Sequence, residues 1–441
     1  LYPCKLTQFV FVGHVSAQNG ATEYEINLNK GVVRSEQRLY CDLKHPHPRI
    51  FCGQYKNDVP TATQNHFYFS TETNYSVLFR GRVDDVSGSK DPKNWAEEFH
   101  NAFVKGGINC LNTFHGEFSV AIFNASTQHT ILIRDRFGVV PLYYYVNNLC
   151  HAFSTSCAVL KKLPNVSLQK DMAWIHSYLF ENTSAVSSSQ TPYENIFKVP
   201  AGHVVELEGD KVKKVSSYHT WQDNSPKAKT INPKYVAKHQ DLLRTAISKR
   251  TPTDGPIIVE TSGGLDSGTV LAMLARDHNN PLISVSSVHH SQEADLIAAC
   301  NDQANVIKHY AQPAKADAID DVIELEISSL GYLSSQGLEV QLSIFSKIHQ
   351  ETQARIIYSG FGGDEVITNM GDRRVMEAFD NRNYLQLWSL IPGHPAKRPF
   401  RFIKTLLNKG ADPRFRSNIL NLLELLKETS LLRQRITDQH G

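Results

Sequence analysis

Apolar and polar residues are arranged in two different ways along the chain. Over residues 1–215 the apolar positions fall in short, aromatic-rich, alternating segments separated by turn residues, a pattern that predicts strands. Residues 208–210, Glu-Gly-Asp, predict a hairpin turn, and residues 95–103 and 172–180 have helical spacing. This half therefore predicts a layered α+β domain, with strands at residues 9–15, 67–70, 77–83, 118–124, 130–134, 142–146 and 203–207.

The pattern changes after residues 222–232, QDNSPKAKTIN, a polar stretch that predicts a linker. Apolar residues at 236, 242, 243, 246 and 247 then predict a helix with a core-facing stripe over 235–249. Strands at 257–260, 282–285 and 356–358 alternate with helices that start near 266 and 294, as in a doubly wound parallel sheet. We therefore expect an α/β multidomain protein with a domain at 1–215, a linker at 216–232 and a second domain at 233–441.

Composition excludes several classes of partner. Lys and Arg number 46 against 44 Asp and Glu, so the net charge of +2 gives no general attraction to nucleic acid or membrane. The basic run at 397–404 is interpreted as a solvated helix start. No apolar run reaches the length of a membrane span and no secretory signal precedes the first strand. The seven cysteines lack metal or disulfide spacing. We expect a cytoplasmic protein with reduced cysteines, without a membrane or nucleic-acid partner.

Residues 256–274, PIIVETSGGLDSGTVLAML, predict a buried strand, a tight glycine turn and the start of a helix. Free backbone N–H groups of such a turn and the helix N-terminus would attract phosphates. The turn has no lysine of the Walker type, but it has an acid, Asp266, which beside phosphates implies a bridging Mg²⁺. The alternative is an ordinary strand-to-helix turn. The expected nucleotide-binding residues are Ser262, Gly263, Gly264, Leu265, Asp266 and Ser267.

A second glycine cluster, YSGFGGDE at 358–365, follows another apolar segment. Ligands bind at the carboxyl ends of strands in a doubly wound sheet, so we expect both glycine turns to open onto one crevice. Asp266 and Asp364 would then hold the same Mg²⁺ or pyrophosphate, and Ser359 and Gly360 would contact the nucleotide. The alternative is a flexible loop with solvated acids.

The first motif resembles that of the PP-loop ATP pyrophosphatases, and the two motifs in this order resemble the asparagine synthetase family. GEFSVAIF at 116–123, RDRFGVVPLYY at 134–144 and VPAGH at 199–203 extend the resemblance to the first half, and 282–288 is similar to the strand that lies along adenine. The resemblance implies an Ntn-hydrolase-like domain of the glutamine amidotransferase type 2 kind, followed by a PP-loop domain that uses ATP and Mg²⁺ to adenylate a carboxylate.

The first half departs from this family at the glutamine site. Active glutaminases of the family begin with a cysteine whose own α-amine is the base, whereas this chain begins with Leu1 and first has a cysteine at Cys4. Arg80-Gly81-Arg82 stands where the family has Asn-Gly-Glu, and the family's acidic glutamine motif has no match at 87–91. We therefore expect no glutaminase activity. We also expect a processed or truncated chain, because it begins with Leu1 and not Met, and because the family's catalytic lysine has no match after Asp364.

In the second half, Phe361 stands where asparagine synthetases have an acid. An aromatic residue there is similar to the β-lactam synthetases and macrolactam-forming cyclases, which join an adenylated carboxylate to an amine of the substrate. The resemblance implies an AMP-forming amide ligase acting on a small-molecule or peptide carboxylate, with Phe361 at the substrate or merely in a core behind the turn. An asparagine synthase that uses aspartate, or an inactive relative acting as a binding module, are the alternatives. A tRNA-modifying enzyme is disfavoured by the β-rich half, and a homodimer stays open.

Overall fold

The structure is a computed structural model. It describes residues 10–16, 39–40, 50–55, 67–85, 94–124, 127, 129–147, 150–161, 166–178, 189–221, 233–288, 291–313, 327, 331–332, 339–354, 356–363 and 388. The chain divides into two compact units, one of Leu1–Ile257, Ser287–His289 and Tyr310–Ile356, the other of Ile258–Ser286, His290–His309 and Ile357–Gly441. The linker expected at 222–232 lies outside the described residues, so the domain boundaries stay a prediction.

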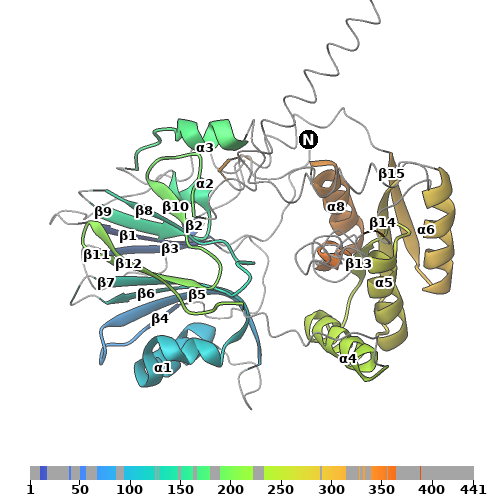
Figure 1. Cartoon of the computed structure of the whole chain (residues 1–441), viewed down its shortest axis with the longest axis horizontal. Coiled ribbons are helices and arrows are strands. Elements are labelled where there is room, and N and C mark those ends of the chain that lie inside the picture. The colour runs from blue at the N-terminus through green and yellow to red at the C-terminus, as the bar shows by residue number, and fades with distance from the viewer. Residues whose placement is uncertain are drawn as a thin grey trace, which may run out of the picture. The chain divides into compact units, whose positions relative to one another are not determined.

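Two six-stranded antiparallel sheets form the first unit (Figure 1). One has the order β10-β8-β9-β1-β3-β2 and the other the order β12-β11-β7-β6-β5-β4. The strands are β1 Val10–Ser16, β2 Leu39–Tyr40, β3 Ile50–Tyr55, β4 Phe67–Phe69, β5 Tyr75–Asp85, β6 His115–Asn124, β7 His129–Arg134, β8 Tyr143–Val146, β9 Cys150–Ser154, β10 Ile196–Lys198, β11 His203–Glu208 and β12 Lys211–Ser217. Every strand expected in this half is present, with its ends moved by a few residues.

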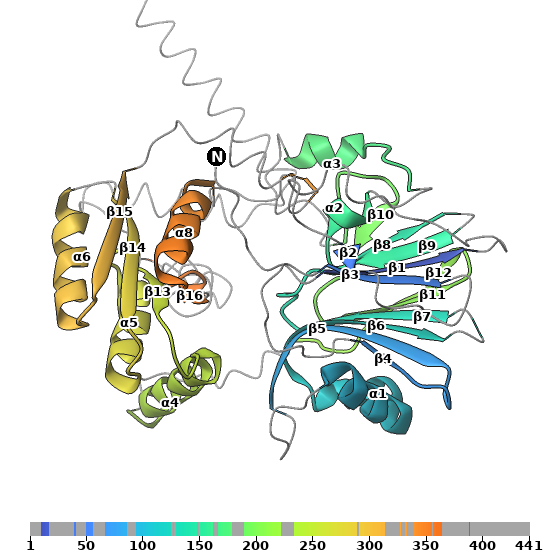
Figure 2. The ribbon, with the colours of Figure 1, turned by 180° about the vertical axis from the view of Figure 1, so that it is seen from behind.

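Helices cover the outer faces of these sheets, and the view from behind shows the same layers (Figure 2). Helix α1, Trp95–Gly106, packs on the β4–β5–β6 sheet and continues into the 3₁₀ turn η1, Gly107–Asn112. The short helices α2, Cys157–Leu160, and α3, Met172–His176, belong to the side of the other sheet. The layered α+β arrangement expected from the sequence is thus confirmed.

The alternating side chains of the strands fill separate cores. Along β5, Val77 and Phe79 point toward α1, whereas Leu78 points into the space between the two sheets. In β8, Tyr144 joins the core between the sheets, while the flanking tyrosines face α2. Because successive side chains of a strand point to opposite faces, one aromatic-rich segment can supply two cores. The space between the sheets is therefore lined by the alternate residues of β5, β6 and β7.

The predicted hairpin joins β11 to β12 through Gly209 and Asp210. Gly209 has φ +60°, a left-handed conformation that glycine adopts without a Cβ penalty. Cys110 and Cys157 are buried free thiols, as expected. Burial raises the pKa of Cys110 to about 11 and that of Cys157 to about 12, so both are poor nucleophiles at neutral pH.

A four-stranded parallel sheet follows, with the order β15-β14-β13-β16. Strand β13 lies between β14 and β16, so the connections leave it in opposite directions, and its carboxyl end is the topological switch point where ligands bind in such sheets. The elements are β13 Ile257–Glu260, β14 Leu282–Val288, β15 Lys308–Pro313, β16 Ile356–Tyr358 and the helices α4 Pro233–Arg250, α5 Leu265–Asp277, α6 Ser291–Gln303 and α8 Glu339–Thr352. Strand β15 and helix α8 were not predicted.

Helix α4 corrects one expectation. Its length agrees with the predicted 235–249, but the predicted core stripe is only partly buried: Leu242 is 61% exposed and Val236 is also exposed, whereas Leu243 and Ala246 are half-buried. Only Ile247 is buried along this helix. The spacing therefore predicted the helix correctly and its burial only in part, because periodicity shows an apolar face without showing what covers it. None of the helices described here is both long and apolar enough to cross a bilayer.

Candidate functional site

The turn between β13 and α5 is fixed by main-chain and hydroxyl contacts. The N–H of Thr261 donates to the carbonyl of Val285 at 2.8 Å, which holds the end of β13 to β14. The N–H of Ser262 then donates to the hydroxyl of Ser267 at 3.2 Å, and the two hydroxyl oxygens are 3.1 Å apart. Ser267 is buried, whereas Ser262 is exposed. The buried hydroxyl thus closes the turn from inside, and the exposed one lies at its mouth.

The N-terminus of α5 is left without a side-chain cap. Helix α1 begins with Asn94, whose side chain accepts from the N–H groups of Ala96 and Glu97 at 3.0 and 3.3 Å. At α5 the cap position is Gly264, and within the described part of the chain no side chain accepts from the first turn. Uncapped N–H groups at a helix start carry partial positive charge and bind anions. This end of α5 can therefore hold phosphate.

The second turn follows β16 and is held by its own contacts. The N–H of Phe361 donates to the hydroxyl of Ser359 at 3.0 Å, and the N–H of Gly363 donates to the carbonyl of Gly360 at 3.1 Å. The distance between this turn and the first one leaves no pattern in the sequence.

The structure brings the two turns into contact. A Cβ atom added at Gly360 would lie 2.5 Å from the backbone nitrogen of Ser267, and one added at Gly363 would overlap the carboxylate of Asp266. Neither position can hold a side chain without movement of the other turn. The Asp266 carboxylate therefore lies against the backbone of residue 363, immediately before Asp364 in the sequence.

Two other predicted site residues have exposed side chains, and a third lies outside the described residues. Phe361 is 91% exposed and Leu265 is 85% exposed, so both side chains project from the turns. The alternative in which Phe361 fills a core behind the turn is therefore wrong. Asp364 and Glu365 lie outside the described residues.

A bound cation would need oxygen ligands from both turns. Within the ranges that the structure describes, no group of three His, Cys, Asp or Glu side chains could hold a metal by itself. One carboxylate at the contact of two glycine turns fits Mg²⁺ well, because Mg²⁺ commonly takes one or two carboxylates and completes its shell with phosphate and water. Asp266 is that carboxylate.

A residue that the sequence analysis missed lies on the neighbouring strands. His309 in β15 has its two ring nitrogens 2.6 Å from the hydroxyl of Ser284 and 3.2 Å from that of Ser286, both in β14. Both serines are buried, and burial lowers the pKa of His309. A neutral imidazole can accept from one hydroxyl and donate to the other. The signal in the sequence was the pair of serines two apart in a strand, which places both on one face.

Comparisons with known proteins agree with this architecture. Residues 93–219 match the glutamine amidotransferase domain family, and residues 238–439 match the asparagine synthase family. The two matches place the chain in one class of protein, in which a layered amidotransferase-type domain is followed by a parallel-sheet domain with paired glycine turns. The chain thus combines a glutamine amidotransferase domain with an asparagine synthase domain, the two-domain arrangement of proteins named asparagine synthetase.

Two curated relatives have this family's name. Asparagine synthetase (glutamine-hydrolysing) 3 of Bacillus subtilis is 24% identical over 225 residues, covering 50% of this chain and 34% of that protein. Asparagine synthetase (glutamine-hydrolysing) of Pongo abelii is 25% identical over 291 residues, covering 60% of this chain and 47% of that protein. The chain spans about a third of the length of the first relatives it matches.

Solved structures give a weaker likeness. Glutamine phosphoribosylpyrophosphate amidotransferase from B. subtilis has a TM-score of 0.28 at 10% identity, covering 70% of this chain and 76% of that one. NH3-dependent NAD synthetase from Campylobacter jejuni has a TM-score of 0.21 at 11% identity. The likeness covers 41% of this chain and 96% of that one. Scores this low support no argument about function.

Proposed function

We propose that this protein is an ATP-dependent carbon–nitrogen ligase that adenylates a substrate carboxylate, releases pyrophosphate, and passes the acyl group to an amine. The observation that carries the proposal is the contact between the Asp266 carboxylate and the backbone of Gly363. An anion-binding helix start and an acid at the same point suit a triphosphate neutralised partly by amides and partly by a cation. A turn kept for geometry alone would need neither the uncapped N–H groups nor the acid.

The roles of the chain's residues follow from their places. The N–H groups of the first turn of α5 would hold phosphate oxygens, and the exposed hydroxyl of Ser262, which accepts from the N–H of Gly264 at 3.3 Å, would donate to one of them. Asp266 and Asp364 would hold Mg²⁺, which, when bound, neutralises the pyrophosphate leaving group. Ser359 and Gly360 would line the nucleotide from the second turn. These residues orient the triphosphate, so the substrate carboxylate attacks its α-phosphorus and pyrophosphate departs.

The amine acceptor has two candidate sources. Phe361 projects from the second turn as an exposed aromatic ring, which supports an organic amine carried by the substrate, as in the β-lactam synthetase-like interpretation. The names of the relatives favour the second candidate, an asparagine synthase that transfers ammonia to aspartate. The substrate class is a small-molecule or peptide carboxylate in either case. The three cysteines whose side chains the structure describes are free thiols, which suits the reducing cytoplasm that we propose as its location.

Product analysis tests the proposal. Purified protein is incubated with ATP, Mg²⁺ and a panel of carboxylates, and exchange of labelled pyrophosphate into ATP is measured beside AMP and ADP formation. Carboxylate-dependent exchange with AMP as product is expected. Formation of ADP and phosphate instead would overturn the assignment, and an absence of exchange with every carboxylate would favour the inactive binding module.

A further inference from the structure

We propose that the first unit binds a small oxyanion, a carboxylate or phosphate, at the Arg80 guanidinium in the space between the two sheets. This site is separate from the glycine turns and goes beyond the proposed ligase reaction. It rests on the orientation of Arg80, on the absence of a counter-charge, and on the way nearby acids are already engaged.

Arg80 faces the space between the sheets. In β5 its neighbour two residues back, Leu78, belongs to the core between the sheets, whereas Val77 and Phe79 pack toward α1. Side chains two apart in a strand share a face, so Arg80 starts on the same face as Leu78. Strand β1 of the opposite sheet contacts β5, which closes this space from the other side. The guanidinium is thus partly removed from solvent and still accessible.

Arg80 has no counter-charge in the described part of the chain. Among the described residues, none accepts a hydrogen bond from its guanidinium or forms an ion pair with it. Burial lowers the pKa of this guanidinium to about 10, and no neighbouring acid offsets the shift. A desolvated charge without a partner is unfavourable, and a bound anion removes that cost.

The row of residues across the sheet adds a second positive charge. Arg80 pairs with Ser119 in β6, and Ser119 pairs with Arg134 in β7. Arg134 donates to three main-chain carbonyls, those of Gly138, Val140 and Val199, and so gains no negative partner from them. Two strand spacings separate the backbones of the two arginines, about 10 Å. Arg80 and Arg134 therefore stand two strands apart in one row across the sheet.

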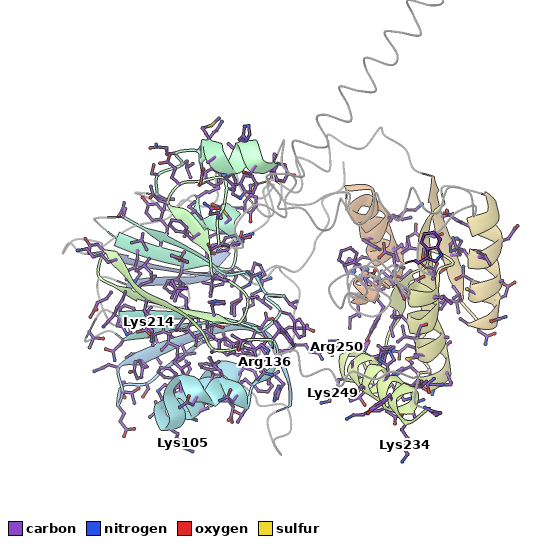
Figure 3. All side chains as sticks on the ribbon, viewed as in Figure 1. Lys105, Arg136, Lys214, Lys234, Lys249 and Arg250 are labelled. Carbon is purple, nitrogen blue, oxygen red and sulfur yellow. The ribbon has the colours of Figure 1, made fainter. Side chains whose placement is uncertain are left out.

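The acids of this region are already engaged. Glu117, which pairs with Arg82 across β5 and β6, accepts from the Nε and a terminal nitrogen of Arg250 at 2.9 Å each. Arg250 is labelled in Figure 3, at the end of α4.

Asp135 is engaged in a different way. It is fully buried and accepts from the N–H groups of Phe137, Val139 and Val140 at 2.9, 3.2 and 3.1 Å. Because Glu117 and Asp135 are both occupied, neither of these two described acids neutralises Arg80, and an anion from outside can do so. Arginine forms paired hydrogen bonds with carboxylate and phosphate, which defines the ligand class.

Anion binding to the full chain tests this site. Inorganic phosphate and succinate are titrated by calorimetry and by thermal unfolding, at constant ionic strength set with sodium chloride and without nucleotide. The variants are Arg80→Met, which keeps the length and removes the charge, and Arg80→Lys, which keeps the charge and removes the paired donors. The matched control is Arg244→Met, because Arg244 is an exposed arginine on α4.

We expect at least one anion to raise Tm of the wild type and of Arg244→Met, and Arg80→Met to weaken its binding at least tenfold. Without anion, Arg80→Met should unfold at a higher temperature than the wild type, because the unpaired charge is gone. Arg80→Lys should fold and bind several-fold more weakly. Binding by succinate identifies a carboxylate site, and binding by phosphate alone identifies a phosphate site.

Two results would overturn the proposal. One is that neither anion binds the wild type. The other is that Arg80→Met, or Arg80→Lys if the methionine variant does not fold, binds as well as the wild type, which would place the anion elsewhere, including at the glycine turns. Asp266→Asn should keep the anion-dependent rise in Tm even if it loses pyrophosphate exchange, so the two proposals can fail separately.

Discussion

The carboxylate of Asp266 lies against the backbone of Gly363, so the first turn of α5 and the turn after β16 share one surface although about a hundred residues separate them. The contact works only because residue 363 has no side chain. The proposed nucleotide site therefore requires glycine at position 363, and adding a single methyl group there tests this requirement.

Gly363→Ala should disable pyrophosphate exchange without unfolding the first unit. The added Cβ would overlap the Asp266 carboxylate, and even a displacement of about 1 Å at a reacting group costs on the order of 100-fold in rate. Gly268→Ala is the matched control, because a Cβ at this α5 position meets nothing within 4 Å. It should retain exchange and gain about 0.5–1 kcal/mol of stability. Equal exchange in both variants would show that the turn contact is not needed.

Asp266→Asn should lower the rate of adenylation while the turn keeps its shape. The amide preserves the size of the side chain but loses the charge that would anchor Mg²⁺, a loss of about 2–4 kcal/mol of transition-state stabilisation, or roughly 30- to 1000-fold in rate. Steady-state exchange as a function of Mg²⁺ concentration is the measurement. The defect should be largest at low Mg²⁺. An equal loss of exchange rate at all Mg²⁺ concentrations would argue that Asp266 supports the turn and does not bind Mg²⁺.

Glutamine should not be hydrolysed by the first domain. Arg80-Gly81-Arg82 stands where the family has Asn-Gly-Glu, so cationic side chains replace the acceptor that would hold the glutamine amide. Glutamate release from glutamine, measured with and without ATP, should equal the rate without protein. If hydrolysis does occur and Cys4→Ala abolishes it, trimming exposes an active cysteine, and the asparagine synthase alternative gains support.

The sequence predicted those parts of the fold that leave a local signal. Alternation in β5 and β8 predicts strands because each side chain faces a packed core, and the turn residues around Gly209 predict the hairpin. The two glycine clusters predicted the two turns at which the nucleotide site is proposed, because glycine turns after buried strands have a distinctive composition.

Other features depend on contacts far apart in sequence. Helix α4 has an apolar stripe that is only partly buried, and strand β15 gave no alternating pattern. The exposure of Phe361 and the contact of Asp266 with Gly363 are set by how two turns meet. No pattern within either turn contains that information.

Acidification should weaken the hold of His309 on β14. Burial lowers the pKa of His309 below its ordinary value of 6.5, so the folded state binds fewer protons than the unfolded chain. Stability therefore rises with pH between the folded pKa and 6.5, and the contribution is fully present above that value. The Tm difference between wild type and His309→Gln should shrink as the pH falls below 6.5. His239→Gln, at an exposed position of α4, is the control and should show no such trend.

Phe361 distinguishes the two candidate acceptors. Its ring projects from the second turn at 91% exposure, so a substitution there changes what the site presents without opening a cavity. If the acceptor is an organic amine, Phe361→Tyr should retain amide formation with amines, whereas Phe361→Glu should lower it by about tenfold and favour ammonia, because a carboxylate attracts a small cation and replaces an apolar contact. Amide products are quantified by mass spectrometry with ammonia and with organic amines, after a carboxylate has been identified by pyrophosphate exchange. Wild-type protein that makes asparagine from aspartate and ammonia as readily as any other amide would refute the cyclase-like interpretation and establish the asparagine synthase alternative.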